Sequence, residues 1–237
     1  MSNKQSSLQT HRKNTQLDTF ENTTNQESYS EFLEALENVR SKIARGPTPA
    51  FNEAHVIKAV EIIADHKIVG RTTLSNELEL GIGTTRTVLK HLKRWDYIVS
   101  SKLGFTLSQN GKKLLHQIKS KISQRVQVPN TPLAVGPVVV ALIVKNVGHK
   151  VNRGIEQRNT AIRAGASGAT TLIFCDSKLI IPSQKKHSSK GLKQIQKVLN
   201  TELNPQENDA IILGSGINLI NAEIGAIMAA IKLLKNE

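Results

Sequence analysis

Apolar residues recur three and four positions apart along most of residues 31–122, with polar residues between them. This spacing places the apolar side chains on one face of a helix, so it predicts a series of amphipathic helices. The expected helices occupy residues 31–44, a segment that Asn52 caps, a short segment around Leu74 and Leu78, residues 84–95, and a segment that begins at Ser108 or Asn110.

The pattern changes on both sides of the helix 84–95. Residues 81–83, Gly-Ile-Gly, precede it and are typical of a tight turn between two helices. Residues 97–107 follow it and contain two short apolar runs on either side of a Lys-Leu-Gly turn, which predicts a β-hairpin. The ordered set predicts a winged helix-turn-helix, with helix 84–95 in the major groove of DNA and the wing 97–107 on the backbone. The alternative is a helical hairpin that only packs.

Polar and basic side chains occupy the positions that the apolar face of helix 84–95 leaves free. They are Thr84, Thr85, Arg86, Lys90, His91 and Arg94. Hydrogen-bonding and cationic side chains of this kind recognise base edges and phosphates. Lys102, at the tip of the wing, is expected to contact phosphate rather than bases. These seven residues are the predicted DNA-binding residues, and double-stranded DNA is the predicted partner.

Leu107, Ser108 and Gly111 close the wing in a Leu-Ser/Thr-x-x-Gly pattern. Together with the leucine-bearing helix, the glycine turn and the threonine-rich start of the next helix, they resemble the winged-helix domains of bacterial and archaeal regulators of the MarR and DtxR type. The segments GPTPAFNEAHVIKA and GIEQRNTAIRAGA are similar to an archaeal family of two-domain proteins with a winged helix and a C-terminal domain of unknown function. The resemblance covers most of residues 46–235, and it implies no known ligand for the second domain.

Residues 134–237 show a different pattern, in which short β-branched runs alternate with helical spacing. Strands are predicted at residues 138–144, 170–175, 179–181 and 210–213, and helices at 155–164, 191–199 and 222–234. The order βαββαβα fits a ferredoxin-like split βαβ sheet with one extra helix. The predicted fold class is therefore α+β, with a winged domain at 30–127, a linker at 128–133 and an α/β domain at 134–237.

Candidate chemistry in the second domain is sparse. Arg158 and Arg163 lie on its first helix, and Gly214, Ser215 and Gly216 follow its last strand, where backbone amides can cradle an anion. If these groups converge, they bind an anionic small-molecule effector; a solvated helix face and a plain strand-to-helix turn are the alternatives. With one cysteine and no metal or catalytic constellation in the sequence, we expect no cofactor and no enzyme activity.

Charge and composition narrow the function. The formal net charge is +13, and residues 53–125 alone hold 13 basic and 6 acidic side chains, which favours a polyanionic partner. Residues 1–29 are rich in Ser, Thr, Asn and Gln, so they are expected to be disordered. No secretory signal and no apolar run of about eighteen residues is visible, so we expect a cytoplasmic protein with no membrane partner.

The sequence therefore leads to one main hypothesis and one alternative. The main hypothesis is a DNA-binding transcriptional regulator whose second domain senses a small molecule, dimerises the protein, or both. A two-fold dimer would double the DNA site. The expected dimer surfaces are the closing helix 222–234 and an apolar stripe made of Phe32, Leu36, Val39 and Ile43. The alternative is a metabolite-binding protein or an enzyme with its site in the C-terminal domain.

Overall fold

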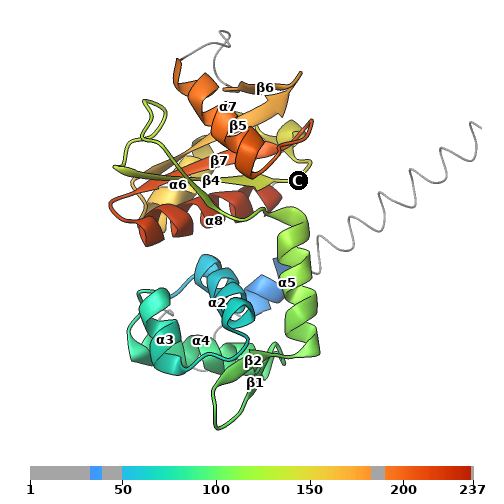
Figure 1. Cartoon of the computed structure of the whole chain (residues 1–237), viewed down its shortest axis with the longest axis vertical. Helices are drawn as coiled ribbons and strands as arrows, with labels where there is room; N and C mark the ends of the chain where they lie inside the picture. Colours follow the sequence, from blue (N-terminus) through green and yellow to red (C-terminus); the bar gives the residue numbers. More distant parts are fainter. Residues whose placement is uncertain (1–32, 39–49, 183–189, 236–237) are drawn as a thin grey trace, which may run out of the picture.

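The computed structural model describes residues 33–38, 50–182 and 190–235, and they form a mixed helix and sheet protein, as the sequence predicts. A helical half with a small hairpin at its far end faces a half built on a five-stranded sheet, and α5 passes from one half to the other (Figure 1).

Some of the sequence-based expectations fall outside the described residues. They include the predicted disordered tail, residues 1–29, and three residues of the predicted dimer stripe, Phe32, Val39 and Ile43. Of the predicted helix 31–44, residues 33–38 are described and are helical.

The helical half contains the predicted elements in the predicted order. They are α2 (Glu53–His66), α3 (Arg71–Glu77), α4 (Ile82–Arg94), β1 (Ile98–Ser100), β2 (Phe105–Leu107) and α5 (Gln109–Lys121). α4 begins at Ile82, two residues before the predicted start, so the turn between α3 and α4 is shorter than the glycine pattern indicates.

Side-chain caps fix where two of these helices begin. The Asn52 side chain accepts a hydrogen bond from the His55 amide at 3.3 Å, and the His55 ring nitrogen Nδ1 accepts one from the Asn52 amide at 3.2 Å. This reciprocal pair is a capping box in which histidine takes the place of the usual Glu or Gln. Ser108, rather than Asn110, caps α5 by accepting from the Gly111 amide at 3.0 Å.

The β1–β2 hairpin is anchored to the segment between α2 and α3. Val69 and Phe105 exchange two backbone hydrogen bonds, of 3.1 and 2.9 Å. Gly104 has a φ of 144°, and a Cβ atom there would lie 2.6 Å from the Val69 carbonyl oxygen. Only glycine permits both the backbone angle and this close approach, so the tip of the hairpin is held at a fixed distance from the helices.

The sheet half begins earlier than predicted. β3 (Val126–Val128) pairs antiparallel with β4 (Val138–Val144), and Ile122, just after α5, forms a bridge with Val144. The first residue of the predicted linker 128–133 thus belongs to an edge strand, and α5 leads directly into the sheet. A run of three residues is too short to show the strand period, which is why the sequence did not indicate β3.

The remaining elements complete a sheet whose neighbouring strands are all antiparallel. They are η1 (Gly148–Lys150), α6 (Ile155–Arg163), β5 (Gly168–Cys175), β6 (Lys178–Ile180), α7 (Lys190–Glu202), β7 (Ala210–Gly216) and α8 (Leu219–Lys235). The strand order is β3-β4-β7-β5-β6.

Helices cover both faces of this sheet. Val140 and Leu142 of β4 join the apolar cluster that contains α6 and α8, whereas Val139 and Ala141 join the cluster that contains α7. A ferredoxin-like sheet carries its helices on one face and its last strand at an edge. Here the last strand, β7, lies between β4 and β5, so the ferredoxin-like prediction is wrong. The predicted element order was correct from α6 onward, but strand order depends on long-range pairing that this order does not determine.

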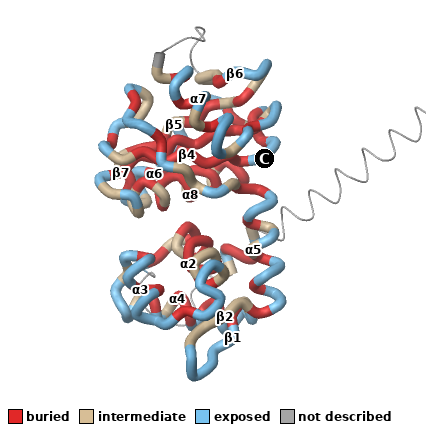
Figure 2. Tube along the Cα trace, viewed as in Figure 1, coloured by how far each residue is buried: buried red, intermediate tan, exposed pale blue. Residues whose placement is uncertain are grey.

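α8 lies between the sheet and the helical half, and buried residues face it from both sides (Figure 2). Its side chains share one apolar cluster with Ile57 and Val60 of α2 and with Leu142 of β4. A helix that is apolar on nearly all sides is expected in such a position. The prediction that helix 222–234 is a dimer surface is therefore wrong, and Leu36 of the predicted stripe is also fully buried within the chain.

Candidate nucleic-acid interface

Four cationic side chains are exposed on α4: Arg86, Lys90, Lys93 and Arg94. Spacings of three and four residues place the first three in one stripe parallel to the helix axis. The opposite face of α4 packs into the core through apolar side chains. The exposed positions of Arg86, Lys90 and Arg94 agree with the sequence-based prediction, and Thr84 beside them is half-buried.

Two predicted DNA-binding residues lie on the buried face instead. Thr85 is fully buried, and its hydroxyl donates to the Gly81 carbonyl oxygen at 3.2 Å. His91 is 3 % exposed, and its ring meets the Phe51 ring edge-on with centroids 5.6 Å apart. The prediction that these two side chains are exposed is wrong: both lie on the buried face of α4, and Phe51, which precedes α2, packs against His91. Helical periodicity within α4 does not show a contact with so distant a segment.

Lys93 was not among the predicted residues, although it completes the exposed stripe. Its Nζ atom donates to the Ser100 hydroxyl of β1 at 2.8 Å and so joins α4 to the hairpin. Lys93 follows Arg86 by seven residues and Lys90 by three, and this spacing in the sequence already indicates that the three side chains share one helix face. At the hairpin tip Lys102 is exposed, as predicted, and the neighbouring Leu103 is 78 % exposed.

The carboxylates that flank α3 and α4 in the sequence bind other groups. Glu77 pairs with His66 at 2.7 Å, Glu79 accepts from the Asn218 amide group at 3.3 Å, and Asp96 accepts from the Asn110 side chain at 3.0 Å. The partners of these three carboxylates are His66, Asn218 and Asn110, none of which belongs to the stripe.

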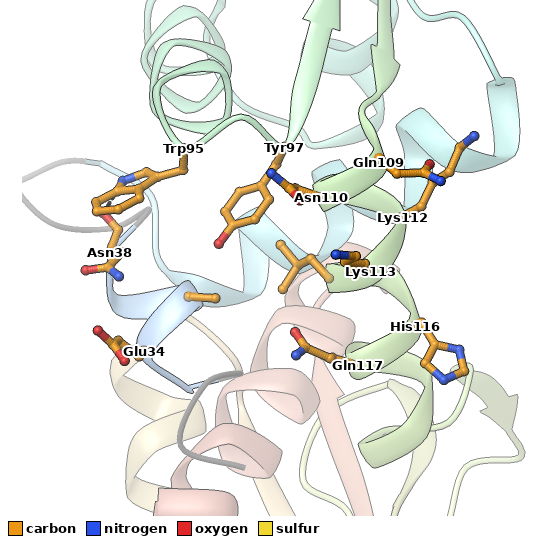
Figure 3. Close-up of a pocket in the computed structure, with 12 residues that line it drawn as sticks. Glu34, Asn38, Trp95, Tyr97, Gln109, Asn110, Lys112, Lys113, His116 and Gln117 are labelled. Carbon is orange, nitrogen blue, oxygen red and sulfur yellow. Dashed lines mark hydrogen bonds between the residues drawn. The ribbon is translucent and has the colours of Figure 1, made fainter. Parts of the chain in front are cut away.

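A groove of about 840 Å³ lies behind the hairpin, between residues 33–38, the end of α4 and α5 (Figure 3). Trp95 and Tyr97 form one wall, and Lys113 of α5 lies across from them. Trp95 is 37 % exposed, and its Nε1 donates to the Asn38 carbonyl oxygen at 3.0 Å. The groove therefore adjoins the base of the hairpin without including the stripe of α4.

Buried ion pairs join α2 to the sheet half. Lys58 of α2 pairs with Glu223 of α8, and the Arg125 guanidinium donates to both carboxylate oxygens of Glu61. Burial alone would lower the pKa of Arg125, but the hydrogen bond and the charge of Glu61 outweigh it, and the pKa is raised. These contacts hold α2, and with it the helical half, against the sheet half.

The predicted effector residues are not brought together. Arg158 and Arg163 are exposed on α6, where they contact their helix neighbours Asn159 and Thr160 at 3.4 Å. The triplet Gly214, Ser215 and Gly216 forms the buried end of β7 rather than a turn. The prediction that these backbone amides cradle an anion is wrong, because residues 214 and 215 pair with strands on both sides, β4 and β5.

The described part of the chain contains no group of three or more His, Cys, Asp or Glu side chains that could hold a metal ion. None of its helices combines the length and the apolar character needed to cross a membrane.

Comparisons with known proteins give one family-model match in each half of the chain. Residues 60–113 match the family model of a PH0730-like N-terminal domain, and residues 135–233 match a domain of unknown function, DUF4443. Together the two matches fit a two-domain protein of archaeal type. No curated protein matches the chain.

One solved structure extends this likeness over both halves. It is the hypothetical protein PH0730 from Pyrococcus horikoshii OT3, which is 26% identical to this chain, with a TM-score of 0.63. The match covers 79% of this chain and 95% of that protein. The expected similarity to a two-domain archaeal family is thus confirmed in so far as both halves of the chain match together.

Proposed function

We propose that the chain is a DNA-binding transcriptional regulator in which α2 to α5 form a winged helix and α4 is the recognition helix. The observation that carries the proposal is the exposed stripe of Arg86, Lys90 and Lys93 on the second helix after a tight turn, tied to the hairpin through Ser100. A helix of this kind beside a hairpin is the docking geometry of helix-turn-helix proteins.

In this proposal the basic residues have different roles. Arg86 lies in the first turns of α4, where side chains of a recognition helix reach base edges, and arginine pairs in bidentate fashion with guanine. Lys90, Lys93 and Arg94 follow toward the C-terminal end and are suited to phosphate contacts. Lys102 at the hairpin tip contacts the backbone of the flanking DNA.

The sheet half acts in this proposal as the regulatory part, and we assign it no catalytic step. Its contact with the helical half is extensive and buried, through the ion pair of Lys58 with Glu223 and the shared apolar cluster. A ligand or a second copy bound to the sheet half would act on DNA binding by changing how α2 is held. The names of the matched families state no function, so the proposal rests on the geometry of α4 and the hairpin.

The experiment that tests the proposal compares two triple variants with equal loss of charge. The first carries Arg86→Gln, Lys90→Gln and Lys93→Gln on α4. The control carries Lys145→Gln, Arg158→Gln and Lys178→Gln, three exposed residues of the sheet half. Affinity for a pool of duplex DNA is measured by fluorescence anisotropy over a range of salt concentrations.

The α4 variant is expected to lose affinity by roughly 100-fold or more and to reduce the salt slope by about two to three ions. The control is expected to stay within about threefold of the wild type. Equal losses in the two variants would show that binding follows net charge alone and would refute the assignment of α4.

A further inference from the structure

An open cavity of about 780 Å³ lies where the start of α6 meets the end of α8. Four cationic side chains and a single carboxylate line it; these are Lys150, Arg153, Lys232, Lys235 and Glu156. Glu156 forms an exposed ion pair with Lys232 at 3.2 Å, which leaves three cations in excess. The volume is in the range of sites for small molecules. An excess of cations around a concave surface favours a ligand with more than one negative charge.

The backbone at the start of α6 adds donors to this cavity. Gly154 precedes the helix in the left-handed conformation, with φ of 71°, and no side chain caps the helix. The amides of the first turn therefore point out of the helix start without an intrahelical acceptor. The positive end of the helix dipole has the same location, so both features favour an anion there.

A buried hydroxyl lies directly behind this helix start. Thr171 of β5 is 4 % exposed, and its Oγ1 atom has no hydrogen-bond partner among the described residues. The same atom lies 3.2 Å from the position that a Cβ atom would occupy on Gly154. Gly154 lines the cavity and Thr171 does not, so this hydroxyl lies in the wall behind the helix start.

We propose that this cavity binds a small phosphate-bearing metabolite with two or more negative charges. The phosphate lies at the start of α6, where the amides of the first turn donate to it and Arg153 neutralises it. Lys150 and Lys232 hold the second anionic group from the two sides of the cavity. The predicted effector class, an anion, is retained, but its site is the start of α6 rather than the exposed face that carries Arg158.

The cavity also reaches the contact between the two halves. Lys235 forms ion pairs with Glu37 of the helical half at 2.6 Å and with the buried Glu53 of α2 at 3.7 Å. A bound anion competes with Glu37 for Lys235, so binding loosens this contact. The anion site goes beyond the proposed function. It is tested on the full chain without DNA, so the anion site and the DNA-binding function can each fail independently.

The test is calorimetric titration of the full chain with pyrophosphate at constant ionic strength. Arg153→Gln is expected to weaken binding by roughly 10-fold or more, because a charge-assisted pair is lost. Arg163→Gln, an exposed arginine at the other end of α6, is the control and should change the affinity less than about twofold. No binding to the wild type, or equal losses in Arg153→Gln and Arg163→Gln, would overturn the proposal.

Competition for Lys235 has a separate readout. Glu37→Gln removes the competitor and should tighten pyrophosphate binding by about two- to fivefold, the range expected for an exposed ion pair. Glu34→Gln, on the same helix, is the control and should leave affinity unchanged. Unchanged affinity in Glu37→Gln would overturn the link between the cavity and the helical half.

A DNA backbone is the other source of phosphate. In a second arm, Arg153→Gln is titrated with a duplex of about 20 base pairs. Wild-type affinity for this duplex is expected. A large loss of duplex affinity in a protein that does not bind pyrophosphate would assign the cavity to DNA and would refute the metabolite site.

Discussion

Lys58 of α2 and Glu223 of α8 form an ion pair in which the side chains are only 10% and 15% exposed. The residues are 165 positions apart in the sequence, and their contact joins the helical half to the sheet half. A buried charge that loses its partner is strongly destabilising, whereas loss of both charges is often nearly neutral. The pair therefore disfavours arrangements of the two halves that leave either charge unpaired, and it adds little net stability.

This pair leads to a prediction about stability. Glu223→Leu leaves the Lys58 ammonium buried and unpaired, so we expect a loss of about 3–5 kcal/mol in the free energy of unfolding. The double variant Lys58→Met/Glu223→Leu should recover most of that loss. The measurement is urea denaturation, and a double variant as unstable as Glu223→Leu would contradict the role of the pair.

Arg86 is predicted to determine sequence preference. Arg86→Ala should cost about 1–3 kcal/mol at a contacted base pair and should bring the affinities for the preferred and random duplexes closer together. The preferred sequence is first obtained by selection from a random pool. Arg158→Ala, an exposed arginine of the sheet half, is the control. If the ratio of the two affinities is unchanged in Arg86→Ala, this residue does not read bases.

Lys102 is predicted to contact phosphate. Lys102→Ala should weaken binding to all duplexes by a similar factor and reduce the salt slope by about one ion. The exposed position of this residue at the hairpin tip supports a backbone contact. Titrations of two unrelated duplexes at several salt concentrations measure both effects. A loss confined to one sequence would show base recognition instead.

His55 leads to a prediction about pH. Its burial, and secondly the charge of Lys58, lower its pKa from 6.5 to about 4. Between these values the unfolded chain binds the proton more strongly than the folded chain does. The stability from neutral His55 is thus complete above about pH 6.5 and decreases as pH falls toward 4, by up to about 3 kcal/mol.

His55→Gln isolates this effect. Glutamine at this position of a capping box can still accept from the Asn52 amide, and it does not titrate. Between pH 6.5 and 4 the stability of the variant should depend less on pH than that of the wild type, as measured by urea denaturation at each pH. Identical pH profiles for the two proteins would exclude His55 as the titrating group.

Dimer formation stays a prediction, with α8 no longer a surface for it. A single winged helix contacts few base pairs, so we expect two copies on a site with two-fold symmetry, with half-sites about one helical turn of DNA apart. Light scattering with a selected duplex should give the mass of two chains per duplex. One chain per duplex at micromolar concentration would exclude the dimer.

The sequence by itself determined the elements of the helical half. The spacing of Val88 and Leu92 and the cap at Asn52 are local features, and each fixes a local structure without help from distant residues. The basic character of α4 follows from the same spacing. Local patterns therefore sufficed to predict the helix order, the hairpin, and the exposure of Arg86, Lys90, Arg94 and Lys102.

Only the tertiary structure decided which of the candidate residues are exposed together. Phe51 buries His91, β4 and β5 pair with both sides of the Gly214 segment, and the helical half covers α8. The cationic cavity likewise combines Arg153 with Lys232, which are far apart in the sequence. Such contacts depend on strand order and on the packing of the two halves. The period of apolar residues describes one element at a time, so it carries no information about strand order or about packing between the halves.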